Sequence, residues 1–196
     1  MKITNEYVFF YKDWLSNYQR TSFVANIDDI LGKTDGLMKE LFTSTEQGFM
    51  YIKALYFNDL KTASKIIKTN NPAECRKLGR QVKGYDDEAW AKIRYDVFYY
   101  LNLEKYKQDR QLQYLLLDKK YDNKKFVEAS PIDKIWGIGF DENNPNIEFN
   151  QIYWGKNYLG RILTNIRRRF KENKIDDPNW NIYNYWGKED ETDIPS

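Results

Sequence analysis

The segment Thr45–Phe57 constrains the fold of this chain more than any other part of the sequence. Drawn as a helix, it is apolar around most of its circumference, which is typical of an element buried in a protein interior. Glu46 and Lys53 nevertheless lie seven positions apart, close to two helical turns, so both side chains point to the same side. A carboxylate and an amine are costly to desolvate there unless they pair or take part in chemistry. We therefore predict a buried helix that carries a working acid and amine.

Both charged residues also have structural explanations. Thr43 is a good N-cap for this helix, and Glu46 at the third position would complete a capping box. Lys53 would lie along the helix surface with its ammonium group in water. The apolar circumference of the helix favours burial of Lys53 over this surface position.

The chain contains no histidine, which excludes several kinds of catalytic site. A Ser-His-Asp triad, a Cys-His pair and a histidine-rich zinc site are all ruled out. The one cysteine, Cys75, cannot form an internal disulfide, and a free cysteine on an expected helix is typically buried and inert. We therefore expect Glu46 and Lys53 to supply the acid, base or nucleophile, with no metal and no cofactor.

The composition is that of a folded protein with one full core. The chain has 196 residues, 41% of them hydrophobic, and a formal net charge of +2. This charge gives no electrostatic reason to expect a nucleic-acid binder. The N-terminus lacks the layout of a signal peptide, and no stretch is apolar over the length of a membrane span. We expect a soluble, cytoplasmic protein with no membrane partner, and the sequence leaves its oligomeric state open.

Helical patterns outnumber strand patterns along the chain. Aromatic and β-branched runs predict short strands at residues 7–11, 22–24 and 126–129. Capping residues and apolar periodicity predict helices at residues 59–68, 71–79, 86–103, 109–117 and 159–170, with an excursion or short helix within 27–41. We predict an α+β fold, a single mostly helical domain with a small β-sheet over residues 1–170. An aromatic and then acidic C-terminal tail follows over residues 171–196.

Two further short segments contain candidate substrate-binding residues. Ser16 and Asn17 are small polar residues set among aromatic ones. Arg80 follows the end of an expected helix, and its planar guanidinium is suited to phosphate. The structural alternatives are a turn held by the Asn17 side chain and a solvated arginine.

Two more clusters contain glycine. Gly137 and Gly139 permit close approach of the backbone to a ligand. Trp136, which follows Asp133 by three residues and directly precedes Gly137, offers a face for stacking. A tight turn over a core tryptophan is the structural alternative. At the start of the last helix, the segment Asn157–Gly160 presents backbone N–H groups that bind anions, or Asn157 serves as a cap.

Trp90 and the run Arg167–Arg169 have simple structural explanations. Trp90 lies on a long expected helix, where core packing is the default. The three arginines suit nucleic-acid phosphates, but we favour a solvated basic helix end, which the helix dipole stabilises.

Taken in order, these clusters resemble the YbiA-like family, also called the NADAR superfamily. The resemblance spans residues 7–169 and rests on Phe9-Phe10 with Trp14 to Tyr18, Thr45-Glu46 with Lys53, Gly79-Arg80, Trp90, Asp133 with Trp136 to Gly139, and Asn157 to Gly160 with Ile166-Arg167. It implies an α+β fold and an N-glycosidase that hydrolyses a bond between ribose C1 and a nitrogen. The substrates that it implies are phosphoribosylated intermediates of riboflavin synthesis and ADP-ribosylated guanine.

The resemblance also implies roles for individual residues. Glu46 and Lys53 would be the reactive pair, with Glu46 as acid and base and Lys53 as amine nucleophile or electrostatic stabiliser. The expected substrate-binding residues are Ser16, Asn17, Arg80, Trp90, Asp133, Trp136, Gly137, Gly139, Asn157 and Gly160. The partner would be a phosphoribosyl or ADP-ribosyl substrate, with nucleic acid only as a modified substrate.

The chain departs from the family pattern in two respects. Members usually have a histidine after the glutamate of the first helix, whereas this chain has Gln47-Gly48. Residues 27–41, residues 141–153 and the C-terminal tail are longer than in the family core. These differences leave the reactive pair in place and the substrate open. The alternative function is a module that binds ADP-ribose or a nucleotide without catalysis.

Overall fold

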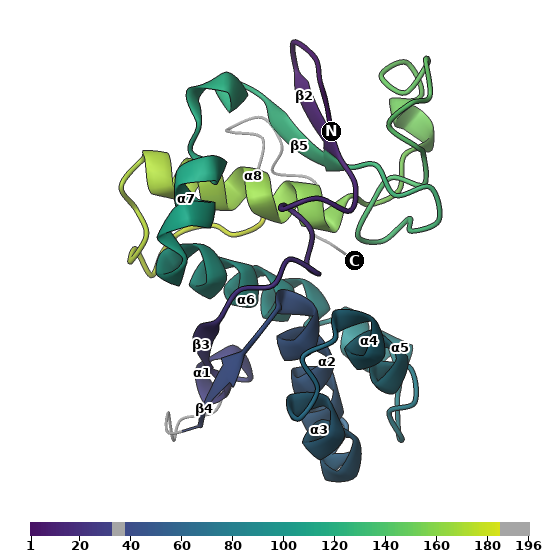
Figure 1. Cartoon of the computed structure of the whole chain (residues 1–196), viewed down its shortest axis with the longest axis vertical. Coiled ribbons are helices and arrows are strands. Elements are labelled where there is room, and N and C mark those ends of the chain that lie inside the picture. The colour runs from purple at the N-terminus through teal and green to yellow at the C-terminus, as the bar shows by residue number, and fades with distance from the viewer. Residues whose placement is uncertain (33–37, 185–196) are drawn as a thin grey trace. The chain divides into compact units, whose positions relative to one another are not determined.

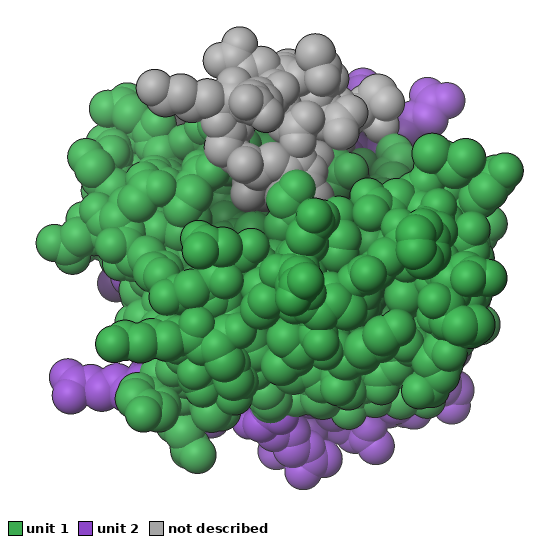
Figure 2. All heavy atoms as spheres, turned by 90° about the horizontal axis from the view of Figure 1, so that it is seen from above, with its two compact units in different colours: residues 1–16, 111–195 green, residues 17–110, 196 purple. Residues whose placement is uncertain are grey.

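The computed structural model describes residues 1–32 and 38–184. Within these residues the chain forms eight α-helices and five short strands, so the expected mostly helical α+β class is confirmed (Figure 1). The chain divides into two compact units (Figure 2). Of the described residues, unit 1 contains 1–16 and 111–184, and unit 2 contains 17–32 and 38–110. Each unit has its own sheet and its own buried residues.

Unit 1 is built around a three-stranded sheet. Its strands are β1 (Lys2–Ile3), β2 (Tyr7–Phe10) and β5 (Lys125–Glu128), in the order β1-β2-β5. β1 is antiparallel and β5 parallel to β2, with Phe9 opposite Val127. All four residues of β2 are buried, as an aromatic and β-branched run predicts for a strand covered on both faces. The core on one side of the sheet contains Tyr7, Phe9, Val127, Ala129, Ile138 and Ile147.

Helix α8 (Tyr158–Lys171) packs against β5, and the chain after the helix docks on it (Figure 1). Trp180 Nε1 donates a hydrogen bond to Asn165 Oδ1 at 2.7 Å, and Asn165 Nδ2 donates to the Asn181 carbonyl at 3.0 Å. The first aromatic residue of the expected tail is therefore attached to unit 1. The expected boundary at residue 170 stays a prediction, and Tyr185 and Trp186 lie outside the described residues. The remaining elements are α7 (Arg110–Leu116), which belongs to this unit from Gln111 on, η1 (Lys119–Tyr121) and η2 (Gln151–Tyr153).

Gly160 allows α8 to approach β5 closely. A Cβ atom at this position would lie 2.3 Å from the carbonyl oxygen of Phe126 and 2.5 Å from Asn157 Oδ1. One of these neighbours is strand backbone, which cannot rotate away. The glycine at this position is therefore explained by helix–strand packing.

We expect Gly160→Ala to destabilise the chain. In a helix interior, this change alone would stabilise by about 1 kcal/mol. Overlap with a strand carbonyl costs about 1–3 kcal/mol or more, so the net effect is a loss. The measurement is urea unfolding of the wild type and the variant. Gly48→Ala is the matched control, because a Cβ there would meet only side-chain atoms of Leu101 and Phe42, which can shift. A Gly160→Ala chain as stable as the wild type would contradict this packing.

Unit 2 begins with a two-stranded antiparallel sheet. Strands β3 (Phe23–Asn26) and β4 (Lys39–Phe42) pair with Phe23 opposite Phe42, and helix α1 (Ile27–Ile30) follows β3. The excursion expected within residues 27–41 thus contains both a short helix and a strand that the pattern did not indicate. Five helices follow: α2 (Thr45–Tyr56), α3 (Leu60–Ile67), α4 (Pro72–Gly79), α5 (Asp87–Ala91) and α6 (Arg94–Gln108).

Helix α2 is the buried centre of unit 2. It packs against α3, α4 and α6, and eight of its 12 residues are buried (Figure 1). The prediction of a buried helix from its apolar circumference is therefore confirmed. The caps of α3 and α4 also agree with the sequence: Asp59 accepts from the Thr62 N–H, and Asn71 caps a helix that has Pro72 at its first position.

The expected long helix over residues 86–103 is wrong in one respect, because it is two helices. α5 ends at Ala91 and α6 begins at Arg94, and the Ile93 N–H donates to the Trp90 carbonyl at 3.2 Å. This i to i−3 bond tightens the chain and ends the α-helical ladder. Neither glycine nor proline stands at the break, so the sequence carries no local signal for it.

Lys105 is a fully buried lysine in α6. Its side chain is 0% exposed, and burial lowers its pKa to about 7, while the charge of Asp109 opposes this shift. The unfolded chain keeps the ordinary lysine pKa. Between pH 7 and the ordinary value, the unfolded chain therefore binds a proton that the folded chain lacks, and stability rises with pH.

We expect Lys105→Met to remove this dependence. The wild type should gain at most about 1.4 kcal/mol per pH unit from this one proton between pH 7.5 and 9.5. The variant should lose that part of the slope, as measured by denaturant unfolding at several pH values. Lys107→Met, at an exposed position of the same helix, is the control and should keep the slope. Equal slopes in wild type and Lys105→Met would contradict the expectation.

Candidate active site

The N-terminus of α2 is capped by residues other than those expected. Ser44 is the N-cap, and its hydroxyl oxygen accepts from the Gln47 N–H at 3.1 Å. Gln47 Oε1 in turn accepts from the Thr43 N–H at 2.8 Å. The expected capping box of Thr43 and Glu46 is therefore wrong by one residue. Because Gln47 completes the cap, the carboxylate of Glu46 has no part in it.

Glu46 is held by Asn17, which was among the predicted site residues. The glutamate is 3% exposed. Its backbone N–H donates to the Asn17 carbonyl at 3.1 Å, and its carboxylate accepts a hydrogen bond from Asn17 Nδ2. Asn17 therefore satisfies one of the unpaired N–H groups of the first helical turn and orients the carboxylate. A buried carboxylate with a fixed orientation is suited to proton transfer.

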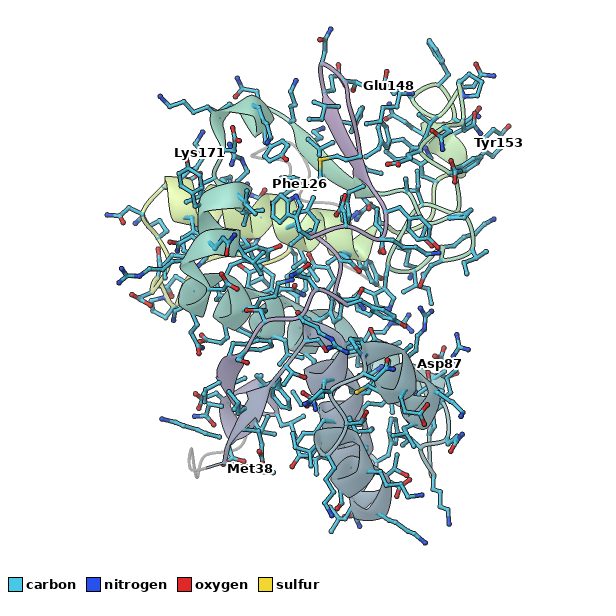
Figure 3. All side chains as sticks on the ribbon, in the orientation of Figure 1. Met38, Asp87, Phe126, Glu148, Tyr153 and Lys171 are labelled. Carbon is cyan, nitrogen blue, oxygen red and sulfur yellow. The ribbon has the colours of Figure 1, made fainter. Side chains whose placement is uncertain are left out.

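Lys53 lies two turns further along α2 and is half-buried. Its ammonium donates to the Gly79 carbonyl at the end of α4 at 3.1 Å and lies 3.8 Å from the centre of the Tyr85 ring. Burial lowers the pKa of Lys53, and the negative charge of Asp87, at the start of α5 (Figure 3), opposes this shift. Of the two sequence interpretations, the structure favours the partly buried amine over one extended into water.

Glu46 and Lys53 are not in direct contact. Within the described residues, the lysine ammonium contacts the Gly79 carbonyl and the Tyr85 ring, not the Glu46 carboxylate. The two residues are seven positions apart, so their Cα atoms are about 10 Å apart along the helix axis. The two side chains would have to converge over this distance to meet. The acid and the amine thus occupy separate positions along α2, each with its own partners.

The end of α4 brings further polar groups to Glu46. Burial and, after it, the charge of Glu46 raise the pKa of the Cys75 thiol to about 11, so Cys75 is protonated at neutral pH and is not a nucleophile. Burial and then Glu46 also raise the pKa of Tyr18, whereas Arg76, which donates a hydrogen bond to the Tyr18 hydroxyl, and Arg80 lower it. Arg80 is exposed, as an arginine that meets a substrate phosphate would be.

Trp90 is a core residue of unit 2 whose aromatic neighbours extend to the ring beside Lys53. It is 3% exposed, and its ring contacts Phe49 at 5.2 Å, Tyr56 at 5.8 Å and Phe57 at 6.2 Å between centroids. Phe57 also contacts Tyr85, the ring beneath the Lys53 ammonium, at 5.4 Å. Trp90 therefore supports the aromatic wall beside Lys53, and its own ring is nearly covered by protein.

The remaining predicted site residues lie in unit 1, where Asp133 and the glycines form a tight turn. The Asp133 carboxylate accepts from the Ile135 and Trp136 N–H groups at 2.9 and 2.8 Å. Gly139 has a φ of +76° and donates to the Asp133 carbonyl at 3.1 Å. A Cβ on Gly137 would lie 2.7 Å from the Glu128 carbonyl. This turn agrees with the structural alternative, while Trp136 keeps a partly exposed ring at its edge.

The start of α8 does not present the free N–H groups that were expected. The N–H groups of Asn157, Tyr158 and Leu159 donate to carbonyl oxygens of the preceding turn, in residues 135–137. The Asn157 side chain makes no cap and instead pairs with β5, accepting from the Glu128 N–H at 2.9 Å and donating to the Phe126 carbonyl at 3.2 Å. These bonds replace the anion site with a link between turn, helix and strand. Ser16 is buried in the same unit, and its N–H donates to the Asp13 carbonyl at 3.0 Å.

Two of the three arginines in the run of α8 are buried and make hydrogen bonds within the fold. Arg167 is 4% exposed and donates to the carbonyls of Leu116 and Asp118 and to the Asp122 carboxylate. Arg169 is 6% exposed and donates to two carbonyls of the following chain. The expectation of a solvated basic helix end is therefore wrong for Arg167 and Arg169, because these side chains donate hydrogen bonds to carbonyl groups and, from Arg167, to a carboxylate inside unit 1. Among the described residues, no helix is long and apolar enough to cross a membrane, and no three acidic or cysteine residues gather into a metal site.

Sequence reasoning missed Tyr18, Arg76 and Tyr85. Tyr18 follows Asn17 directly, and Arg76 lies four residues before Arg80 on one face of α4, which is a signal of helical spacing. Tyr85 lies in a loop with no pattern that connects it to Lys53. Only the packing of unit 2 shows that contact.

Comparison with known proteins gives one family. A sequence model described as the NADAR domain matches residues 9–171. Protein irg-1 of Caenorhabditis elegans is 35% identical over 183 residues, 87% of this chain and 85% of that protein. N-glycosidase R617 of Acanthamoeba polyphaga mimivirus is 39% identical over 128 residues, 64% of this chain and 73% of that protein.

Two further matches are more distant. A protein of Vibrio vulnificus named riboflavin biosynthesis protein VVA0006 is 28% identical over 122 residues, 62% of this chain and 30% of that protein. The solved structure of Escherichia coli YbiA has a TM-score of 0.63 at 23% identity, covering 89% of this chain and 90% of that one. At this identity the structural match shows the shared fold.

Proposed function

Because this chain belongs to the NADAR domain family, we propose that it is an N-glycosidase that hydrolyses a bond between ribose C1 and a nitrogen. The observation that carries the proposal is the acid of α2: a Glu46 carboxylate that is 3% exposed, oriented by Asn17 and followed on the same helix by the half-buried amine of Lys53. The relative named N-glycosidase, 39% identical over 128 residues, supports the class of reaction.

Glu46 supplies the acid and then the base. The base of an N-glycoside leaves ribose C1 slowly unless its nitrogen is protonated or the sugar ring is opened. An acid is therefore needed at the leaving nitrogen. Protonated Glu46 gives its proton to that nitrogen, and the resulting carboxylate then takes a proton from the attacking water. The hydrogen bond from Asn17 Nδ2 holds the carboxylate in place for both transfers.

Lys53 has two available roles at C1 of the ribose. As a neutral amine it attacks C1 of the opened ribose, the base departs with a proton, and water hydrolyses the lysine imine to release the sugar. As an ammonium it stabilises negative charge on a ring oxygen or phosphate. We favour the imine, because burial lowers the pKa of Lys53 and so favours the neutral amine.

The substrate carries phosphate in either of the two classes that we propose. One is a phosphoribosylated intermediate of riboflavin synthesis, a class in keeping with the name of the Vibrio vulnificus relative. The other is ADP-ribosylated guanine. Exposed Arg80 at the end of α4 would meet the phosphate. Trp136, with its partly exposed ring, and Asp133 lie in unit 1, and their predicted contact with base or ribose stays a prediction.

A product assay tests this function. The full chain is incubated with a phosphoribosylated pyrimidine and, separately, with an ADP-ribosylated guanine oligonucleotide, and products are identified by mass spectrometry. Formation of free pyrimidine and ribose phosphate from the first substrate, or of unmodified oligonucleotide and ADP-ribose from the second, supports the proposal, and we call either reaction base release. Saturable binding of either ligand without any product would contradict it and favour a non-catalytic reader of ADP-ribose or nucleotides.

A further inference from the structure

Two residues next to Glu46 have no part in the mechanism above. Tyr18 follows Asn17, the residue that binds the Glu46 carboxylate, and Arg76 lies in the last turn of α4. We propose that Tyr18 and Arg76 are a pair of positioning residues that holds Asn17 and the Glu46 carboxylate in their reactive arrangement. This inference rests on the proposed N-glycosidase function.

The first step of the argument is the short path from Tyr18 to the carboxylate. Asn17 contacts Glu46 twice, through its carbonyl oxygen and through its side-chain amide. Any rotation of the backbone at residues 17 and 18 would therefore move the donor that orients the acid. The hydroxyl of Tyr18 anchors this backbone, because it accepts a hydrogen bond from the Arg76 guanidinium.

The second step is the rigid mounting of Arg76. α2 and α4 pack so closely that a Cβ on Gly79 would lie 2.0 Å from Met50 Sδ, and Cys75 beside Arg76 is fully buried. Lys53 further joins the two helices through the Gly79 carbonyl. A guanidinium carried on such a helix has a fixed position relative to α2, so it can fix Tyr18 as well.

The third step is the difference between Arg76 and Arg80, the arginine proposed to bind the substrate phosphate. Arg76 is partly buried and uses its guanidinium on the Tyr18 hydroxyl, whereas Arg80, one turn later, is exposed. Charged and titratable groups around the pair and on helix α4 are Tyr18, Glu46, Lys53, Glu74, Cys75, Arg76, Lys77 and Arg80. We therefore expect loss of Arg76 to affect the chemical step, and loss of Arg80 to affect substrate binding.

The test is a double-mutant cycle with kcat and KM measured separately for base release. Tyr18→Phe and Arg76→Gln are each expected to lower kcat, Arg76→Gln by about 10²-fold, with little change in KM. Since both act through one hydrogen bond, the double variant should be no slower than Arg76→Gln alone. Arg76→Lys keeps the charge and a donor and should recover part of kcat. Lys77→Gln, at an exposed position of the same helix turn, is the control and should leave both constants unchanged.

Several results would overturn the inference while the proposed function stands. These are normal kcat in both single variants, a raised KM with normal kcat in Arg76→Gln, or losses that multiply in the double variant. If Arg76→Gln does not fold, Tyr18→Phe decides alone, because it removes one hydroxyl and no charge; an unchanged kcat then overturns the pair. A wild-type chain that releases no base from either substrate class instead overturns the proposed function, and the pair's role with it.

Discussion

Glu46→Gln is expected to lower kcat for base release by about 10³-fold, because it removes the proton donor and keeps the shape of the side chain. The amide oxygen of the new residue still accepts from Asn17 Nδ2, so the start of α2 should keep its structure. KM should change little, since the proposed role of Glu46 is to transfer protons in the reaction. The measurement is steady-state base release, followed by mass spectrometry, on the substrate class that the wild type accepts.

The matched control for this variant is Glu74→Gln. Glu74 lies on the neighbouring helix α4 and its side chain is 44% exposed, so loss of its charge should leave the rate unchanged. Thermal unfolding of both variants checks that the comparison is made between folded chains. A Glu46→Gln rate within a few-fold of the wild type would remove Glu46 from the mechanism.

Lys53→Ala is expected to reduce turnover by about 10³-fold or more, because either proposed role requires a nitrogen at this position. Lys53→Arg separates the two roles. A guanidinium keeps the positive charge but forms no imine, so the imine route predicts that Lys53→Arg is as inactive as Lys53→Ala. The electrostatic route predicts that Lys53→Arg keeps a measurable part of the rate. Lys83→Ala, at an exposed position after α4, is the control.

Borohydride trapping examines the imine itself. Reduction during turnover should add the mass of the ribosyl fragment to the peptide that contains Lys53, and the adduct should be absent from Lys53→Arg. Active turnover with no adduct on Lys53 would contradict the imine route and leave the electrostatic role. An adduct on Lys105, the fully buried lysine of α6, would place the amine chemistry elsewhere.

The sequence predicted what local patterns can encode. The apolar circumference of Thr45–Phe57 indicated a buried helix, and α2 is buried. Asp59, Asn71 and Pro72 marked helix starts because caps and proline act on their own backbone neighbours. The break between α5 and α6 carries no such residue, and β4 was missed because its sequence, Lys-Glu-Leu-Phe, is half polar.

The site was predictable only in part, for the same physical reason. Glu46 and Lys53 were found because their spacing lies within one helix. Their actual partners, Asn17, Gly79 and Tyr85, come from segments far along the chain and are set by packing. Asn157 and Gly160 were expected to contact substrate. In the structure the Asn157 side chain is hydrogen-bonded to β5, and Gly160 lets α8 approach β5 closely. A motif therefore indicates that a position is special without saying whether for chemistry or for packing.

The most direct test of the account compares single-turnover base release by the wild type and by the Glu46→Gln/Lys53→Ala double variant, with enzyme in excess over substrate. The account predicts that the wild type converts one of the two substrate classes to the unmodified base and to ribose phosphate or ADP-ribose. It predicts that the double variant, folded by thermal unfolding, releases no base above the uncatalysed rate. Base release by the double variant at a rate close to that of the wild type would contradict it.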